Sequence, residues 1–82
     1  MNKDDYMLFK EGLSRGEEYL FTYHDVNYWI SHGPNGDSSL ARDDGTYCQD
    51  FNSLDELLKK AKLEGKTLDE ARNEIEWGIA EL

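Results

Sequence analysis

The side chains with the greatest capacity for chemistry are two histidines, one cysteine and two adjacent aspartates, namely His24, His32, Cys48, Asp43 and Asp44. A cysteine and a histidine can act as nucleophile and base when they lie within hydrogen-bond distance. The spacing of His32 and Cys48 does not indicate such a contact, and no turn in the sequence predicts donors for an oxyanion. A small hydrolase or transferase that uses Cys48 or His32 is therefore the least favoured hypothesis. We predict no catalytic residue and no enzymatic activity.

Metal and cofactor sites are not predicted either. Two histidines and one cysteine do not fall into a zinc-ligand spacing. Residues 35–46, NGDSSLARDDGT, offer oxygen ligands, but they lack the D-x-D-x-D-G order and the terminal glutamate of a calcium loop. Asp43 and Asp44 are better explained as turn formers. The glycines fit turns rather than a phosphate-binding loop, so we expect no cofactor.

The apolar pattern of the first fifty residues predicts one helix followed by antiparallel strands. Residues 4–14 have an apolar stripe with helical spacing, and Gly16 can end that helix. Residues 17–32, EEYLFTYHDVNYWISH, alternate as the two strands of a hairpin do. Turn sequences at residues 33–37 and 43–45 then separate two more short strands. These segments predict an antiparallel meander of three or four strands.

Two helices are expected to follow the strands. Ser53 and Thr67 are each followed three residues later by a glutamate, which is the spacing of a capping box. The first helix has its apolar stripe within residues 54–61 and is expected to end at Gly65. The second has a stripe that begins at residue 68. Trp77 lies off this second stripe. The sequence thus predicts a single α+β domain over residues 1–82, with an N-terminal helix, a meander and two C-terminal helices packed on one sheet face.

The predicted hairpin has one face that suits a hydrophobic core and one face that does not. We expect Tyr23 and Tyr28 to form the closing pair, with Phe21 on the same side of the sheet. Leu20 and Trp29 then lie on the other side. Three short helices can cover one face of a small sheet but hardly two. The second face is therefore left for solvent, a partner or the C-terminal tail.

The chain is strongly acidic, with 18 acidic residues, nine lysines and arginines, and a formal net charge of −9. Residues 16–58 hold nine of the acids and Arg42 alone, whereas residues 59–66 form a basic break with a net charge of +3. This balance opposes direct binding to nucleic acid or anionic lipid and favours a basic partner. A surface that is acidic only for solubility is the simpler alternative.

The same composition predicts a cytoplasmic protein. Cys48 is the only cysteine, so no internal disulfide can form, as is usual in a reducing compartment. No apolar run approaches the roughly 20 residues that span a bilayer. The N-terminal segment MNKDDYMLFK has acids where a signal peptide has basic residues. We therefore expect neither export nor contact with a membrane.

Two runs of the sequence, GEEYLFTYHDVNYWISHG and YCQDFNSLDELLKKAKLEGKTLDEARNEIE, resemble small proteins of unassigned function that are frequent in Firmicutes and their phages and prophages. The pattern of that group has an N-terminal helix, a hairpin of the type F-x-Y-x-G-x-x-Y-x-I, and a helix pair joined by D-G-K-x-L. The matching residues are Phe21, Tyr23, Tyr28, Ile30, Leu57, Leu58, Lys62, Gly65, Lys66 and Leu68. Glu64 replaces the aspartate, and His24-Asp25-Val26 departs from the Asn-Gly type of loop. Because the matches are core and turn residues, the resemblance implies the fold and a bacterial host cytoplasm rather than an activity.

The small size and negative charge also resemble those of anti-CRISPR and DNA-mimic inhibitors. We therefore predict a phage-derived inhibitor, without enzymatic activity, that binds a basic nucleic-acid-binding surface of a host or defence protein such as a CRISPR effector. The alternative is a self-associating phage or prophage protein with a structural or regulatory role, whose exposed hairpin face forms a homodimer contact. The predicted partner-binding residues are Leu20, Asp25, Trp29, Asp37, Asp43, Asp44, Asp50 and Trp77.

Overall fold

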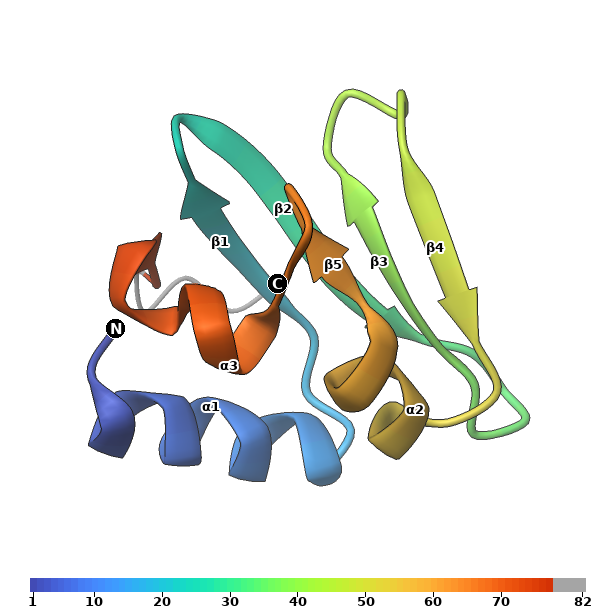
Figure 1. The fold of residues 1–82 in the computed structure, drawn as a ribbon. Helices are drawn as coiled ribbons and strands as arrows, with labels where there is room; N and C mark the ends of the chain where they lie inside the picture. Colours follow the sequence, from blue (N-terminus) through green and yellow to red (C-terminus); the bar gives the residue numbers. More distant parts are fainter. Residues whose placement is uncertain (78–82) are drawn as a thin grey trace.

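The computed structural model describes residues 1–77 and has an α+β architecture (Figure 1). Helix α1 (Lys3–Ser14) precedes the strands β1 (Tyr19–Tyr23), β2 (Val26–His32), β3 (Ser38–Arg42) and β4 (Cys48–Phe51). They are followed by α2 (Leu54–Lys60), β5 (Lys62–Leu63), β6 (Lys66–Thr67), α3 (Leu68–Ala71), the 3₁₀ turn η1 (Arg72–Glu74) and β7 (Ile75–Glu76). The predicted α+β class, the N-terminal helix and the antiparallel meander are confirmed.

The main sheet has five antiparallel strands in the order β4-β3-β2-β1-β7. Strands β1 to β4 follow one another as neighbours, so each is joined to the next by a short turn. Strand β7 then returns from the end of the described chain to pair with β1, with Ile75 opposite Tyr23. The meander of three or four strands that the sequence predicts is therefore extended by a fifth strand.

One face of this sheet forms the hydrophobic core together with the helices. The predicted stripe of α1 is confirmed, since Tyr6, Phe9 and Leu13 are all buried. Gly12 lies between them, where the ring of Tyr19 packs so closely that a β-carbon would collide with its hydroxyl. Figure 1 shows the three helices on the same side of the strands. The buried apolar side chains are Tyr6, Phe9, Leu13, Tyr19, Phe21, Tyr23, Tyr28, Ile30, Leu40, Leu57, Ala61, Leu63, Leu68, Ala71 and Ile75.

The β1–β2 hairpin has the predicted faces but a different register. Tyr23 lies opposite Val26 and Phe21 lies opposite Tyr28, so the expected closing pair of Tyr23 with Tyr28 is wrong. Only His24 and Asp25 form the loop, and both have positive φ angles, 49° and 63°. This is the backbone of a two-residue type I′ turn, which usually requires Asn-Gly. Because the register differs by two residues, each side chain stays on its predicted face.

Contacts from distant segments explain how His24 adopts this conformation. Its two ring nitrogens lie 2.6 Å from Glu64 Oε2 and 3.1 Å from Glu74 Oε1. The imidazole also stacks on the ring of Tyr23, with the ring centroids 3.9 Å apart. Glu64 belongs to the turn between β5 and β6, and Glu74 ends η1. The hairpin tip is therefore held by two carboxylates that are remote in sequence, which local turn rules cannot predict.

This cluster should make stability depend on pH. The carboxylates of Glu74 and Glu64 raise the pKa of His24 above its usual value. Protonated His24 in turn lowers the pKa of Glu74, so that carboxylate stays ionised at neutral pH. The folded state therefore binds the His24 proton more tightly than the unfolded chain does. The stabilisation is complete below the ordinary histidine pKa of about 6.5 and is lost as pH rises through the folded-state value.

We expect the urea midpoint of the wild-type protein to fall from about pH 6 to about pH 8.5 by more than that of a His24→Asn variant. Asparagine is suitable because it tolerates positive φ but does not titrate. Urea unfolding followed by tryptophan fluorescence at both pH values measures the difference. An identical pH dependence in the two proteins would contradict the role of His24.

The C-terminal half differs most from the predicted helix pair. The N-caps are confirmed, since Ser53 accepts a hydrogen bond from the Glu56 backbone and Thr67 forms a complete capping box with Glu70. However, α2 ends at Lys60 rather than at Gly65, and the next residues form the β5–β6 hairpin. Helix α3 is a single turn. The predicted second long helix is therefore wrong within residues 1–77, and its predicted continuation from residue 78 lies outside the described residues.

The helices of the described chain are short. The longest is α1, with 12 residues. Among residues 1–77 no helix has both the length and the apolar character that crossing a bilayer requires.

Candidate protein-interaction face

The sheet face opposite the core, here called the outer face, carries a row of apolar side chains across four strands. Trp29 of β2 lies directly between Leu20 of β1 and Ala41 of β3, and Ala41 lies opposite Cys48 of β4. Directly paired residues of antiparallel strands share a face, with β-carbons about 4.5–5.5 Å apart. Residue Trp29 is 36% exposed, which places it among the exposed large apolar residues. We call Leu20, Trp29, Ala41 and Cys48 the tryptophan row.

A polar row borders the tryptophan row on the side of the β1–β2 turn. Thr22 Oγ1 donates a hydrogen bond of 2.8 Å to Asn27 Oδ1, and Asn27 Nδ2 donates one of 3.3 Å to Asp43 Oδ2. The Asp43 backbone N–H also donates to the Asn27 carbonyl oxygen, at 3.1 Å. These bonds hold the Asp43 carboxylate at the end of the row. An acid therefore ends the polar row that borders Trp29 and its neighbours on this side.

A second polar row borders the tryptophan row on the opposite side. Ser39 Oγ donates a 2.6 Å hydrogen bond to Asp50 Oδ1, and the Cys48 thiol lies 3.4 Å from the same oxygen. These donors, Ser39 first, lower the pKa of Asp50. Desolvation, and then the neighbouring Asp50, raise the pKa of Cys48. The carboxylate is therefore ionised at neutral pH and the thiol is not, which makes Cys48 a weak nucleophile.

The charged residues that the strands place on the outer face are all acidic. Asp50 belongs to β4, and Glu76 of β7 pairs with Thr22 and so shares its face. Arg42 is the only lysine or arginine in these strands. It lies opposite Tyr28 on the core side, with its guanidinium 5.8 Å from the Tyr28 ring centroid and 5.0 Å from that of Tyr47. The outer face of β1, β2, β3, β4 and β7 thus combines an apolar row with negative charge.

The other predicted aspartates lie at the two ends of the strands. Asp25 is in the β1–β2 turn, and Asp43 and Asp44 are in the β3–β4 turn, which is at the same end of the sheet (Figure 1). Thr46 donates two hydrogen bonds to Asp44 and thereby lowers its pKa. Asp37 lies at the opposite end, in the loop between β2 and β3. Acids therefore lie at both ends of the strands that carry the tryptophan row.

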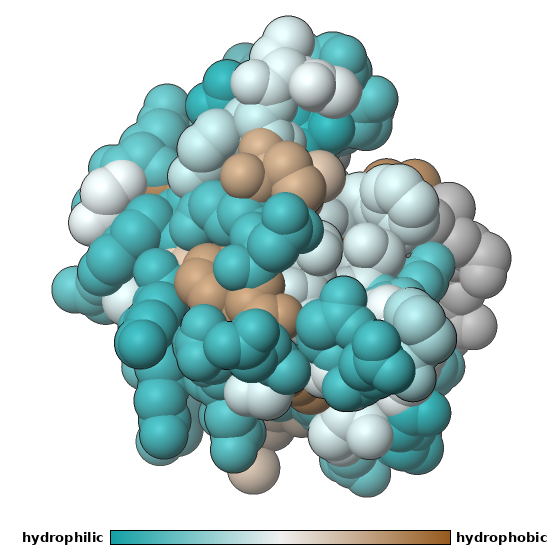
Figure 2. Space-filling view, turned by 90° about the vertical axis from the view of Figure 1, so that its right-hand side faces the viewer, coloured by the Kyte–Doolittle hydropathy of each residue, from teal (hydrophilic) through white to brown (hydrophobic). Residues whose placement is uncertain are grey.

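Trp77 does not join this surface. Its ring packs edge-on against Phe9 and Tyr19, with centroid distances of 5.4 Å and 5.3 Å. Both partners are buried core residues, so Trp77 is partly buried and packs against the core. Figure 2 shows small apolar islands among hydrophilic side chains on the side of the molecule nearest β4.

The residues considered for catalysis are separated by the sheet. His32 lies on the core side, where its ring nitrogens are 2.9 Å from Ser38 Oγ and 3.0 Å from the Glu17 carbonyl oxygen. Cys48 lies on the outer face. The two side chains therefore do not form a nucleophile and base pair in this arrangement. Among residues 1–77, no group of three or more histidine, cysteine or acidic side chains is placed to hold a metal ion.

Two members of the tryptophan row, Ala41 and Cys48, are not among the predicted partner-binding residues. The alternation within the third and fourth predicted strands indicates which residues share a sheet face. The strand order and register are also needed to place Ala41 and Cys48 in one row with Trp29. Glu76 is also absent from the prediction, because its segment is predicted as a helix.

Comparisons of the chain with protein-family models, curated proteins and solved structures gave no match.

Proposed function

We propose that the protein is a non-enzymatic interaction module that binds a basic protein surface on its outer face. The observation that carries this proposal is the tryptophan row, a partly exposed apolar strip whose neighbouring strand charges are all acidic. Tryptophan is a frequent energetic anchor of protein interfaces. Carboxylates around it would pair with arginine and guide association by long-range attraction.

We further propose that the basic surface belongs to a nucleic-acid-binding protein. Such surfaces concentrate arginine and lysine, and arginine can both stack on an indole and form paired hydrogen bonds with a carboxylate. An inhibitor from a phage or prophage, of the anti-CRISPR or DNA-mimic kind, is the biological setting that fits the composition and the resemblance described above. A CRISPR effector would then be one possible target.

Charge favours this partner over a second copy of the same chain. A homodimer through the outer face would place Asp43, Asp50 and Glu76 of one copy close to the same acids of the other. Two chains of net charge −9 also repel each other at long range. Sedimentation that shows a dimer at low protein concentration, lost on Trp29→Ala substitution, would instead support the self-association hypothesis.

The proposal can be tested by calorimetric titration with a peptide of nine arginines, which serves as a defined basic probe. We expect Asp43→Asn and Asp50→Asn each to weaken binding several-fold at low salt, because each removes a carboxylate from a polar row that borders the tryptophan row. Asp4→Asn is the charge-matched control, since Asp4 is exposed in the first turn of α1. Raising the salt from about 50 to about 300 mM should weaken wild-type binding and reduce the difference between the variants. Equal effects of all three substitutions would show that only net charge matters and would contradict the proposal.

A further inference from the structure

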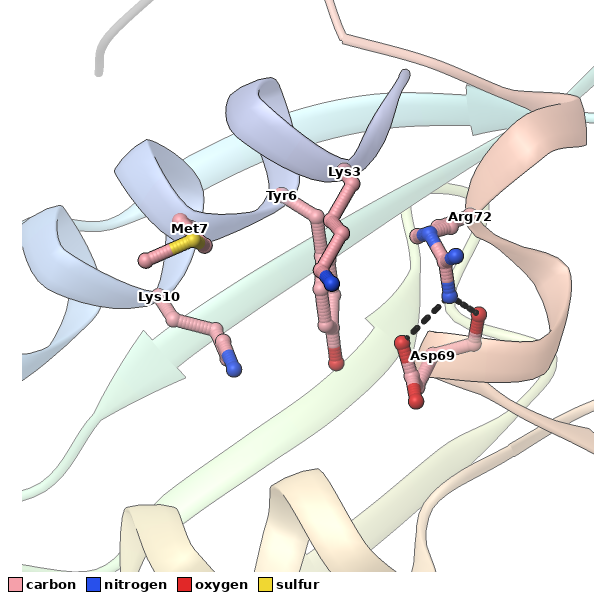
Figure 3. Close-up of a pocket in the computed structure, with 6 residues that line it drawn as sticks. All are labelled: Lys3, Tyr6, Met7, Lys10, Asp69 and Arg72. Carbon is pink, nitrogen blue, oxygen red and sulfur yellow. Dashed lines mark hydrogen bonds and ion pairs between the residues drawn. The ribbon is translucent and has the colours of Figure 1, made fainter.

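A cleft between α1 and the α3–η1 segment gathers positive charge in this otherwise acidic protein. It has a volume of about 360 Å³ and is lined by Lys3, Tyr6, Met7, Lys10, Asp69 and Arg72. Figure 3 shows Lys3, Tyr6 and Lys10 projecting from α1 to one side, with Arg72 and Asp69 across from them. Three cationic side chains against one carboxylate give the lining a net charge of +2. The cleft thus has the opposite charge to the outer face.

The polar groups of the cleft are only partly used by the protein itself. Arg72 Nη1 donates to Asp69, at 2.6 Å to Oδ1 and 3.0 Å to the backbone oxygen. The Lys10 ammonium lies 5.0 Å from the centroid of the Tyr6 ring. Within residues 1–77 neither the Lys3 ammonium nor the Tyr6 hydroxyl has a hydrogen-bond or ion-pair partner. Two donors that border the cleft are therefore available to a ligand.

The hydroxyl of Tyr6 gives the cleft a hydrogen-bond donor that stays protonated. Its ring is almost fully buried, with 4% of the residue exposed. Desolvation raises its pKa to about 12, with a further increase from Asp69 and an opposing effect of Arg72. The hydroxyl consequently remains protonated at physiological pH and can donate a hydrogen bond to an anion. Its fixed position gives the cleft a directional contact, which flexible lysines alone cannot supply.

We infer that this cleft binds the phosphate group of a small phosphate monoester or of inorganic phosphate. A phosphate monoester carries about −1.5 to −2 charges at pH 7, which matches the +2 of the lining, and its oxygens accept hydrogen bonds from ammonium, guanidinium and phenol groups. Met7, which is 57% exposed, borders the same cleft and offers an apolar contact to the organic part of a monoester. The inference is independent of the proposed function, because the cleft is built from α1, α3 and η1 rather than from the sheet.

Titration with inorganic phosphate and with phenyl phosphate, followed by amide chemical shifts at constant ionic strength, tests this inference. We expect saturable shifts in α1 and η1, with dissociation constants on the order of 1 mM. Phenyl phosphate should bind more tightly than inorganic phosphate if the organic part contacts Met7. Equal affinity of the two would assign the cleft to free phosphate, whereas the absence of saturation up to roughly 50 mM of either probe would overturn the inference.

Matched variants distinguish specific binding of phosphate in the cleft from non-specific attraction of phosphate to any exposed lysine. Lys10→Gln and Tyr6→Phe should each weaken binding about fivefold or more, because each removes a donor. Lys59→Gln is the control, since Lys59 is exposed on α2 and does not line this cleft. Tyr6→Phe keeps the buried ring, so an unchanged urea midpoint will show that the variant is folded. If Lys59→Gln weakens binding as much as Lys10→Gln, the phosphate is an adventitious ion only and the inference fails.

Discussion

Replacing Phe9 with alanine is expected to lower the free energy of unfolding by about 3–5 kcal/mol. Phe9 is fully buried, and its ring contacts four other aromatic rings. The centroid distances are 5.3 Å to Tyr19, 5.4 Å to Trp77, 5.9 Å to Phe21 and 6.3 Å to Tyr6. Its removal therefore leaves a cavity where α1, the sheet and the end of the described chain meet. Since small domains have roughly 5–15 kcal/mol of stability in total, much of the fold's stability depends on this one side chain.

Leu8→Ala is the matched control for this prediction. Leu8 is the neighbouring residue of α1, but it is 57% exposed. Alanine and leucine have similar helix propensities, so the change should stay within about 0.5 kcal/mol. Urea unfolding of both variants measures the difference. A loss of less than about 1 kcal/mol for Phe9→Ala would contradict the position of α1 on the core.

Replacing Trp29 with alanine is expected to have the opposite pattern, with a large effect on binding and a small effect on stability. Truncation of a central interface tryptophan typically costs 2 kcal/mol or more, which corresponds to about a 30-fold loss of affinity. The indole stands on the outer face rather than in the core, so we expect the free energy of unfolding to fall by only about 1 kcal/mol. Titration with the nine-arginine peptide measures the first quantity and urea unfolding measures the second.

Leu8→Ala again serves as the control, because it removes an exposed apolar side chain from a different surface. It should leave the affinity for the peptide unchanged. Trp29→Phe should bind with intermediate affinity, since phenylalanine retains an aromatic face for cation–π contact with arginine. Unchanged binding by Trp29→Ala would remove the tryptophan row from the proposed interface.

The parts of the fold that the sequence predicts well are those determined by local patterns. Helical spacing identifies the buried stripe of α1, and the caps at Ser53 and Thr67 are local hydrogen bonds. The two faces of the β1–β2 hairpin also follow from alternation, and they survive the error in register because that error is an even number of residues. The placement of Trp29 on the face opposite the core could therefore be expected before the strand order was known, whereas its exposure could not.

The errors arise where distant contacts override local preference. His24 and Asp25 lack the usual sequence of a two-residue turn, and Glu64 and Glu74 supply the contacts that hold it. Ile75 lies seven residues after Leu68, which suits one face of a helix. A single buried residue suits a strand equally well. The pairing of Ile75 with Tyr23 makes this segment a strand. The cleft at Tyr6 could not be predicted for the same reason, since Lys10 and Arg72 meet only in the folded chain.

The central claim is that the outer face, with Trp29 as its anchor, binds a basic partner. Its most direct test is a nuclear magnetic resonance titration of the isotope-labelled protein with the nine-arginine peptide. We predict that the largest shifts fall on the Trp29 indole N–H and on the backbone amides of residues 20, 41 and 48, and that they diminish as salt is raised. Shifts confined to the helices, with the Trp29 indole signal unchanged, would contradict the claim.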